Sequence, residues 1–156
     1  MKKLLSLFFL FLLFITQAQE KTLIKKTEVT IPIGKKLILK TQTEGNKIIG
    51  FEITEEQNIS EKPDMMNVLT NFEKDETIDN SIELVFCEAQ MMNNPFFMLK
   101  TIQKTGKRMT FKAKIRLKGS PLYSATSIMP VGSNILSFEQ WKDTIDSIFL
   151  YDFELQ

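Results

Sequence analysis

The sequence contains no histidine. This absence excludes histidine general bases, the Ser-His-Asp and Cys-His devices of hydrolases, and the common zinc sites. The 156 residues also contain no S-x-x-K or G-x-S-x-G pattern, and the six glycines form no phosphate-binding loop. An enzyme with this composition would have to use carboxylates, tyrosine or a bound metal. We therefore predict no catalytic residue, no metal site and no cofactor, and expect binding rather than catalysis.

Cysteine is nearly absent as well. The single cysteine, Cys87, excludes an internal disulfide even in an oxidising compartment. It ends the apolar run 82–87, so we expect it to be buried as a small hydrophobic residue. The folded chain must therefore be held together by core packing.

The N-terminal segment has the pattern of a secretory signal peptide. Lys2 and Lys3 precede an apolar run over 4–15, which a short polar exit ending in alanine follows. Crossing a membrane takes about 20 apolar residues, and this run is shorter. We expect residues 1–18 to be a cleavable signal peptide. We expect 19–156 to be a single domain exported to the periplasm or outside a bacterial cell, with no further transmembrane segment.

Alternation of apolar and polar residues predicts strands along most of the chain. It is clearest in 108–118, and segment 96–104 precedes it across the turn Thr105-Gly106-Lys107, so 96–118 is predicted to be a β-hairpin. Pro32, which lacks an amide donor, favours a sheet edge for its strand. The other predicted strands are 28–33, 36–41, 47–54, 81–90 and 148–155.

Two short segments have helical spacing. Residues 63–72 place apolar side chains on one stripe, and Ser137 begins an S-x-x-Q capping box followed by Trp141 at helical spacing from Phe138. Short strands separated by turns favour an antiparallel arrangement over a parallel sheet, which would need long helices. We predict an all-β fold, an antiparallel β-sandwich of jelly-roll type with one or two short helices.

The C-terminal run supports this fold class. Ile145–Leu155 reads IDSIFLYDFEL, which resembles the closing strand of jelly-roll carbohydrate-binding modules. The resemblance covers eleven residues at structural positions and implies a sandwich fold. It implies no binding residue.

Charge is strongly segregated along the chain. Residues 44–88 contain twelve acidic and three basic residues, whereas 89–138 contain eight basic residues and no acidic one. Such segregation indicates an electropositive patch for an anionic polysaccharide, a lipid surface or an acidic protein. Pairing of basic and acidic strands across the sheet also explains it, and exposed charges more often serve such pairing and solubility than ligand binding. Nucleic acid fits a near-neutral exported domain poorly. The candidate basic patch consists of Lys100, Lys104, Lys112, Lys114, Arg116 and Lys118.

A second candidate surface is the long polar segment 120–134, since long loops in compact domains often carry function. Its candidate binding residues are Tyr123, Ser124, Thr126, Ser127 and Asn134. Trp141 and Tyr151 are further aromatics of the kind that sugar-binding surfaces use, although the apolar stripe of the short predicted helix explains Trp141.

Neither of two groups of potential metal ligands predicts a metal site. The acidic residues Glu73, Asp75, Glu76 and Asp79 lack the spacing of a calcium loop, and a solvated acidic turn explains them equally well. The soft ligands Cys87, Met91, Met92 and Met98 are more simply core residues than a copper site.

These observations leave three hypotheses for function. The first is a non-enzymatic exported binding or accessory module for an anionic or glycan partner. The second is a carboxylate-based hydrolase of envelope polymers or glycans, which needs two carboxylates roughly 5–9 Å apart. The third is a structural or assembly protein that docks through an edge strand.

Overall fold

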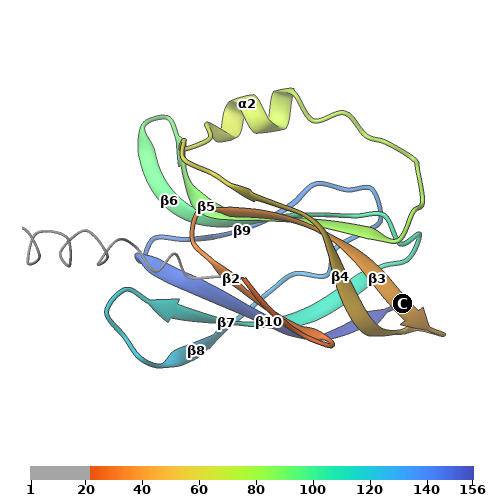
Figure 1. Ribbon diagram of the computed structural model, residues 1–156. Helices are drawn as coiled ribbons and strands as arrows, with labels where there is room; N and C mark the ends of the chain where they lie inside the picture. The colour runs from red at the N-terminus through yellow and green to blue at the C-terminus, as the bar shows by residue number, and fades with distance from the viewer. Residues whose placement is uncertain (1–21) are drawn as a thin grey trace, which may run out of the picture.

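The computed structural model describes residues 22–156, which form ten strands and one short helix (Figure 1). The predicted signal peptide lies outside these described residues. The helix is α2 (Met65–Thr70), and no helix within 22–156 has the length and apolar character needed to cross a membrane. The strands are β1 (Leu23–Lys25), β2 (Glu28–Pro32), β3 (Lys35–Glu44), β4 (Lys47–Asn58), β5 (Ser81–Met91), β6 (Asn94–Gln103), β7 (Met109–Leu117), β8 (Tyr123–Thr126), β9 (Ser137–Trp141) and β10 (Ile145–Leu155).

The ten strands form one sheet that folds over into two layers. The α2 layer contains β4, β3, β5, β6 and β9 in that order, and the β10 layer contains β1, β2, β10, β7 and β8. The layers join where Glu154 of β10 pairs with Lys47 of β4. Figure 1 shows α2 above β5 and β6, with β7 and β8 on the opposite side of the molecule. All the strand pairs are antiparallel, which confirms the predicted fold class with one helix.

The space between the layers is filled by the inward-facing residues of each strand. Leu84 and Phe86 of β5 face Ile148 and Leu150 of β10 in one continuous cluster, and all four are fully buried. Burying a side chain of this size stabilises a fold by about 1.5–3 kcal/mol.

A smaller cluster lies on the outer face of the α2 layer. Met65 packs there against Val85, Cys87 and Met98, so Cys87 is buried and unpaired, as predicted. The carboxylate of Asp64 caps the helix by accepting a hydrogen bond of 2.9 Å from the backbone N–H of Met66. This confirms the helix predicted over 63–72, with narrower bounds.

The predicted β-hairpin over 96–118 is wrong. Strand β6 pairs with β5 and β9, whereas β7 pairs with β10 and β8, so the chain crosses between layers after Gln103. The buried Gln103 side chain organises this crossing, since its amide donates to the carbonyls of Lys107 at 2.7 Å and Val131 at 3.1 Å. Its carbonyl oxygen accepts from the N–H of Thr105 at 2.9 Å. A long-range contact to Val131 thus overrides the local turn signal.

The predicted helix at Ser137 is also wrong. This segment is β9, in which Trp141 pairs with Phe97 and Phe138 pairs with Lys100. The free edge of β6 offers backbone hydrogen bonds to a whole strand, which outweigh the capping-box signal. Pro32 likewise differs from expectation, because β2 lies between β1 and β10 rather than at an edge. The short β1 reaches only as far as Thr30, so Pro32 needs no amide donor on that side.

Candidate functional site

The outer face of the β10 layer carries the basic residues of β7. Strand β7 alternates between buried residues that face the core and side chains that face outward. The outward side chains include Lys112, Lys114 and Arg116, three members of the predicted basic patch.

Three aromatic rings lie on the same face. Register pairing sets Phe149 beside Lys114 and Tyr151 beside Lys112, while Tyr123 of β8 pairs with Arg116. The Phe149 and Tyr151 rings are stacked, with centroids 5.3 Å apart and an interplanar angle of 17°. The Tyr123 ring meets Phe149 edge-on at 6.2 Å. The rings thus form one contiguous cluster across β8 and β10.

Two of the cationic side chains, Lys114 and Arg116, lie over these rings. Lys114 Nζ lies 5.3 Å from the centroid of the Tyr151 ring, and Arg116 Cζ lies 5.7 Å from that of Tyr123. Both distances are within the range of cation–π attraction. The Tyr123 hydroxyl is also within 2.7 Å of Ser147 Oγ, which fixes the ring across the sheet. We call Lys112, Lys114, Arg116, Tyr123, Phe149 and Tyr151 the aromatic–basic face.

Lys112 is held at one end of this face by Asp152. A bulge in β10 after Tyr151 gives Asp152 a positive φ of 53° and brings its carboxylate to 2.9 Å from Lys112 Nζ. The hydrogen bond from Lys112 to Asp152 raises the pKa of the lysine. Phe149 and Asp152 were not among the predicted site residues. Alternation within 145–155 is the signal that places Phe149 on this face.

The rest of the predicted basic patch lies elsewhere. Lys100 and Lys104 are on the outer face of the α2 layer, where they pair with Glu83 at 2.6 Å and Asp75 at 2.5 Å. Lys118 is exposed in the turn that follows β7. The patch is therefore divided between two layers because β6 and β7 do not pair, and its α2-layer lysines pair with acidic side chains.

The candidate binding residues of segment 120–134 also lie in different parts of the fold. Tyr123 joins the aromatic–basic face, whereas Thr126 accepts a hydrogen bond of 2.9 Å from the indole N–H of Trp141. Ser124 and Ser127 are exposed. Asn134 is buried, and its amide nitrogen donates to the carbonyls of Asp75 at 3.0 Å and Thr77 at 3.2 Å once the amide is oriented to suit its surroundings.

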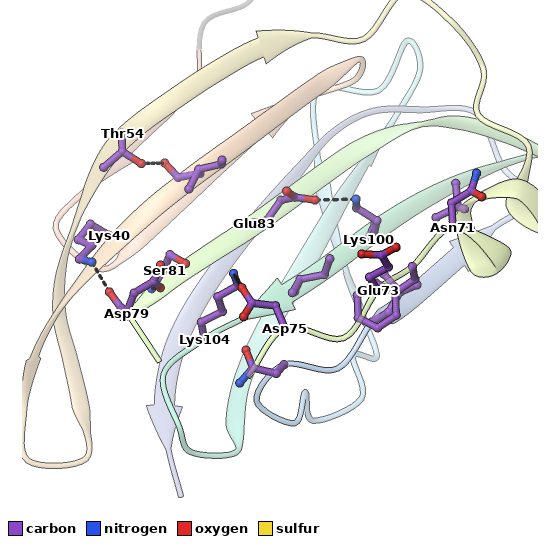
Figure 2. Close-up of a pocket in the computed structure, with 16 residues that line it drawn as sticks. Lys40, Thr54, Asn71, Glu73, Asp75, Asp79, Ser81, Glu83, Lys100 and Lys104 are labelled. Carbon is purple, nitrogen blue, oxygen red and sulfur yellow. Dashed lines mark hydrogen bonds and ion pairs between the residues drawn. The ribbon is translucent and has the colours of Figure 1, made fainter. Parts of the chain in front are cut away.

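A cavity of about 540 Å³ opens on the outer face of the α2 layer (Figure 2). It lies between the strands and the chain that leads from α2 to β5. Carboxylates and lysines from both sides converge on it. The charged lining residues are Lys40, Glu73, Asp75, Asp79, Glu83, Lys100 and Lys104.

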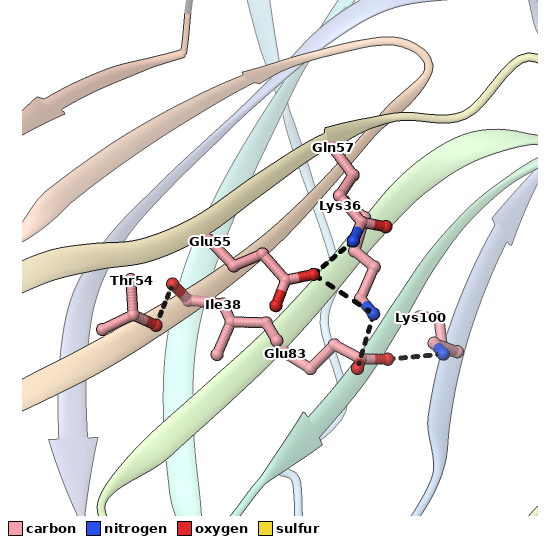
Figure 3. Close-up of polar contacts among 7 residues, drawn as sticks. All are labelled: Lys36, Ile38, Thr54, Glu55, Gln57, Glu83 and Lys100. Atoms are coloured by element: carbon pink, nitrogen blue, oxygen red, sulfur yellow. Dashed lines mark hydrogen bonds and ion pairs between the residues drawn. The ribbon is translucent and has the colours of Figure 1, made fainter.

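Glu83 is the central carboxylate of this lining. Lys100 contacts it at 2.6 Å and Lys36 at 3.5 Å, and Lys36 lies 3.9 Å from Glu55 (Figure 3). Burial opposes ionisation of Glu83, but the hydrogen bonds and charges of Lys100 and Lys36 outweigh it and lower the pKa of this carboxyl.

Two other carboxyl groups of the cavity, those of Asp75 and Asp79, also have lowered pKa values. The hydrogen bond from Lys104 holds the pKa of Asp75 well below its usual range, and hydrogen bonding by Ser81 lowers the pKa of Asp79. General acid catalysis by a carboxyl group at neutral pH requires a raised pKa. Several carboxylates line the cavity, but the pKa values of Glu83, Asp75 and Asp79 are lowered rather than raised.

Within residues 22–156, no group of three or more Cys, Asp or Glu side chains is arranged to hold a metal ion. Cys87 and Met98 are in the buried cluster under α2, whereas Met92 is exposed at the tip of the turn between β5 and β6. Burial raises the pKa of the Cys87 thiol to about 11, which disfavours the thiolate form that binds metals.

No family model, curated protein or solved structure matches the chain. The arrangement of its own side chains is therefore the basis for a proposal of function.

Proposed function

We propose that this protein is an exported, non-enzymatic binding module whose aromatic–basic face binds an anionic glycan. The observation that supports the proposal most directly is the placement of Lys114 and Arg116 against the rings of Tyr151 and Tyr123 on an outer sheet face. The one helix of residues 22–156 lies on the other layer, so it does not cover this face.

The aromatic–basic face has groups that suit both the sugar rings and the acidic groups of an anionic glycan. The aromatic rings add apolar surface that the C–H groups of sugar rings can contact. Arg116, Lys112 and Lys114 add positive charges that attract the carboxylate or sulfate groups of such a ligand. Alternate residues of a strand are about 6.6 Å apart, so β7 presents its cations as a regular row suited to a repeating polyanion.

A glycan is favoured over a membrane surface by the position of the rings. Tyr123, Phe149 and Tyr151 are half-buried and lie against one another and against their cations. Residues that insert into a lipid interface instead present a projecting apolar face. The rings of this face are better placed to support a flat ligand.

The test is binding of residues 19–156 to an anionic polysaccharide such as alginate or heparin, measured by calorimetry at several salt concentrations. The K112E/K114E/R116E variant should lose at least about tenfold in affinity, because rim charges that attract a ligand become charges that repel it. Wild-type affinity should fall as salt screens these charges.

A matched control has the same three charge reversals at exposed lysines outside the face, Lys62, Lys107 and Lys142. This control should keep wild-type affinity apart from a small general effect of net charge. Equal binding by wild type and the K112E/K114E/R116E variant would refute the proposal, as would an equal loss in both triple variants.

A further inference from the structure

The chain between α2 and β5 forms a strap over the cavity of the α2 layer. We call residues 71–78 the strap. From residue 72 to residue 78, the strap forms no backbone–backbone hydrogen bond with another described residue. Its backbone is bonded to the sheet just beyond its end, where the N–H groups of Asp79 and Asn80 both donate to the carbonyl of Lys104, at 3.1 and 3.0 Å.

Side chains hold the strap down at a few points. Asp75 pairs with Lys104 Nζ at 2.5 Å, and the Asn134 amide donates to two strap carbonyls. The Asp75 side chain is 50% exposed, so solvent screens its ion pair with Lys104 and weakens it. Displacing the Asp75 carboxylate from Lys104 therefore costs little.

The cavity beneath the strap has an apolar part and a cationic end. Ile38 and Ile102 flank Glu83 in one row of the sheet, and Lys40 and Lys104 flank Ser81 in the next. Figure 2 shows Lys104 beside Asp75, with Lys40 near Asp79. The apolar lining residues are Ile38, Val68, Phe72, Ile102 and Leu136.

The strap supplies much of the negative charge of the cavity. Glu73 and Asp75 belong to it, whereas Glu83 is neutralised from the sheet by Lys36 and Lys100. When the strap lifts, Lys104 loses the carboxylate of Asp75. Asp75 thus occupies the position that the anionic group of a ligand would take.

We propose that the cavity binds an amphiphilic monoanion, with its apolar part against Val68, Phe72 and Leu136 and its anionic group on Lys104 in place of Asp75. The cavity volume of about 540 Å³ falls within the range of small-molecule sites, roughly 300–1,000 Å³. This site is on the opposite layer from the aromatic–basic face and is independent of it.

The experiment measures binding of dodecanoate to residues 19–156 by calorimetry, below the concentration at which the ligand forms micelles. Dodecanol and dodecylammonium have the same chain length without the negative charge, and both should bind at least about tenfold more weakly, as expected when a charged hydrogen bond is lost. Vesicles of anionic phospholipid form a second arm. The site takes a free monoanion if dodecanoate binds and the vesicles do not, and a lipid headgroup if both bind.

Two substitutions should act in opposite directions. D75N removes the internal competitor of the ligand and should tighten dodecanoate binding about threefold, whereas K104Q removes its partner and should weaken binding about tenfold. The control K74Q changes a strap charge that pairs with Glu76 rather than Lys104, and should stay within about twofold of wild type. Thermal unfolding of each variant verifies that it is folded.

The K112E/K114E/R116E variant should bind dodecanoate as wild type does, which separates this site from the aromatic–basic face. The proposal is overturned if neither wild type nor D75N binds dodecanoate, or if dodecanol binds equally well. It is also overturned if D75N and K104Q shift the affinity in the same direction.

Discussion

The half-buried charge cluster around Glu83 leads to a quantitative prediction about stability. We consider the substitution E83Q, which keeps the size of the side chain and an oxygen acceptor for Lys100 but removes the negative charge. Lys100 and Lys36 then lose their common counter-ion (Figure 3).

The expected cost follows from the exposure of the pair. The side chains of Glu83 and Lys100 are 24% and 18% exposed, so the pair is more buried than a surface ion pair, yet still screened by solvent. Surface pairs contribute about 0–1 kcal/mol and hydrogen bonds to charged groups about 1.5–3 kcal/mol. We expect E83Q to lower the free energy of unfolding by about 1–2 kcal/mol at pH 7.

The sign of the pH dependence follows from the lowered pKa of Glu83. The folded state keeps this carboxyl ionised to lower pH than the unfolded state does, so the unfolded state takes up the proton first on acidification. The contribution is fully present above the ordinary pKa of 4.5 and is lost as the pH falls below that value through the folded pKa. E83Q should lack this component of the acid sensitivity.

The assay is urea unfolding of wild type, E83Q, K100Q and the double variant at pH 7 and at intervals down to pH 3. The double-mutant cycle should give a coupling of about 1 kcal/mol at pH 7 that shrinks toward pH 3. This account of the cluster is refuted if wild type and E83Q have the same free energy of unfolding at pH 7. It is also refuted if the difference between their free energies of unfolding does not change with pH.

Two further predictions concern buried residues. L150A should lower the free energy of unfolding by about 2–5 kcal/mol in urea titration, because Leu150 is fully buried in the central strand β10 and its truncation leaves a void. A loss below about 1 kcal/mol would contradict the described core. Cys87 should react slowly with iodoacetamide at pH 8 in the folded protein and rapidly in urea, because burial raises the pKa of its thiol to about 11; rapid labelling of the folded protein contradicts its burial under α2.

The parts of the fold that could be predicted depend on local alternation. Residues 108–118 alternate so regularly that β7, its inward face and the outward position of Lys112, Lys114 and Arg116 follow from the pattern alone. The helix over 65–70 and the burial of Cys87 were predictable for the same reason, because the spacing of the apolar residues around them indicates which side of the segment is buried.

The parts that failed depend on which strands meet. A strand pattern does not specify its partner, so β6 and β7 were expected to form a hairpin although they lie in different layers. The segment at Ser137 has a local helix signal, but the free edge of β6 offers it a full set of backbone hydrogen bonds. Both errors arise from contacts between residues far apart in the sequence.

The candidate site shows the same division. The residues by themselves determine a histidine-free chain without an internal disulfide, and a strand with cations on its outer face. Tertiary structure decided that Tyr123 and Tyr151 lie against Arg116 and Lys114, because only the pairing of β10 and β8 with β7 brings them together. It also decided that Lys104 faces Asp75 rather than solvent, since β6 lies in the other layer. Side-chain direction is a local property with a period of two, whereas neighbours across a sheet are set by the packing of the whole chain.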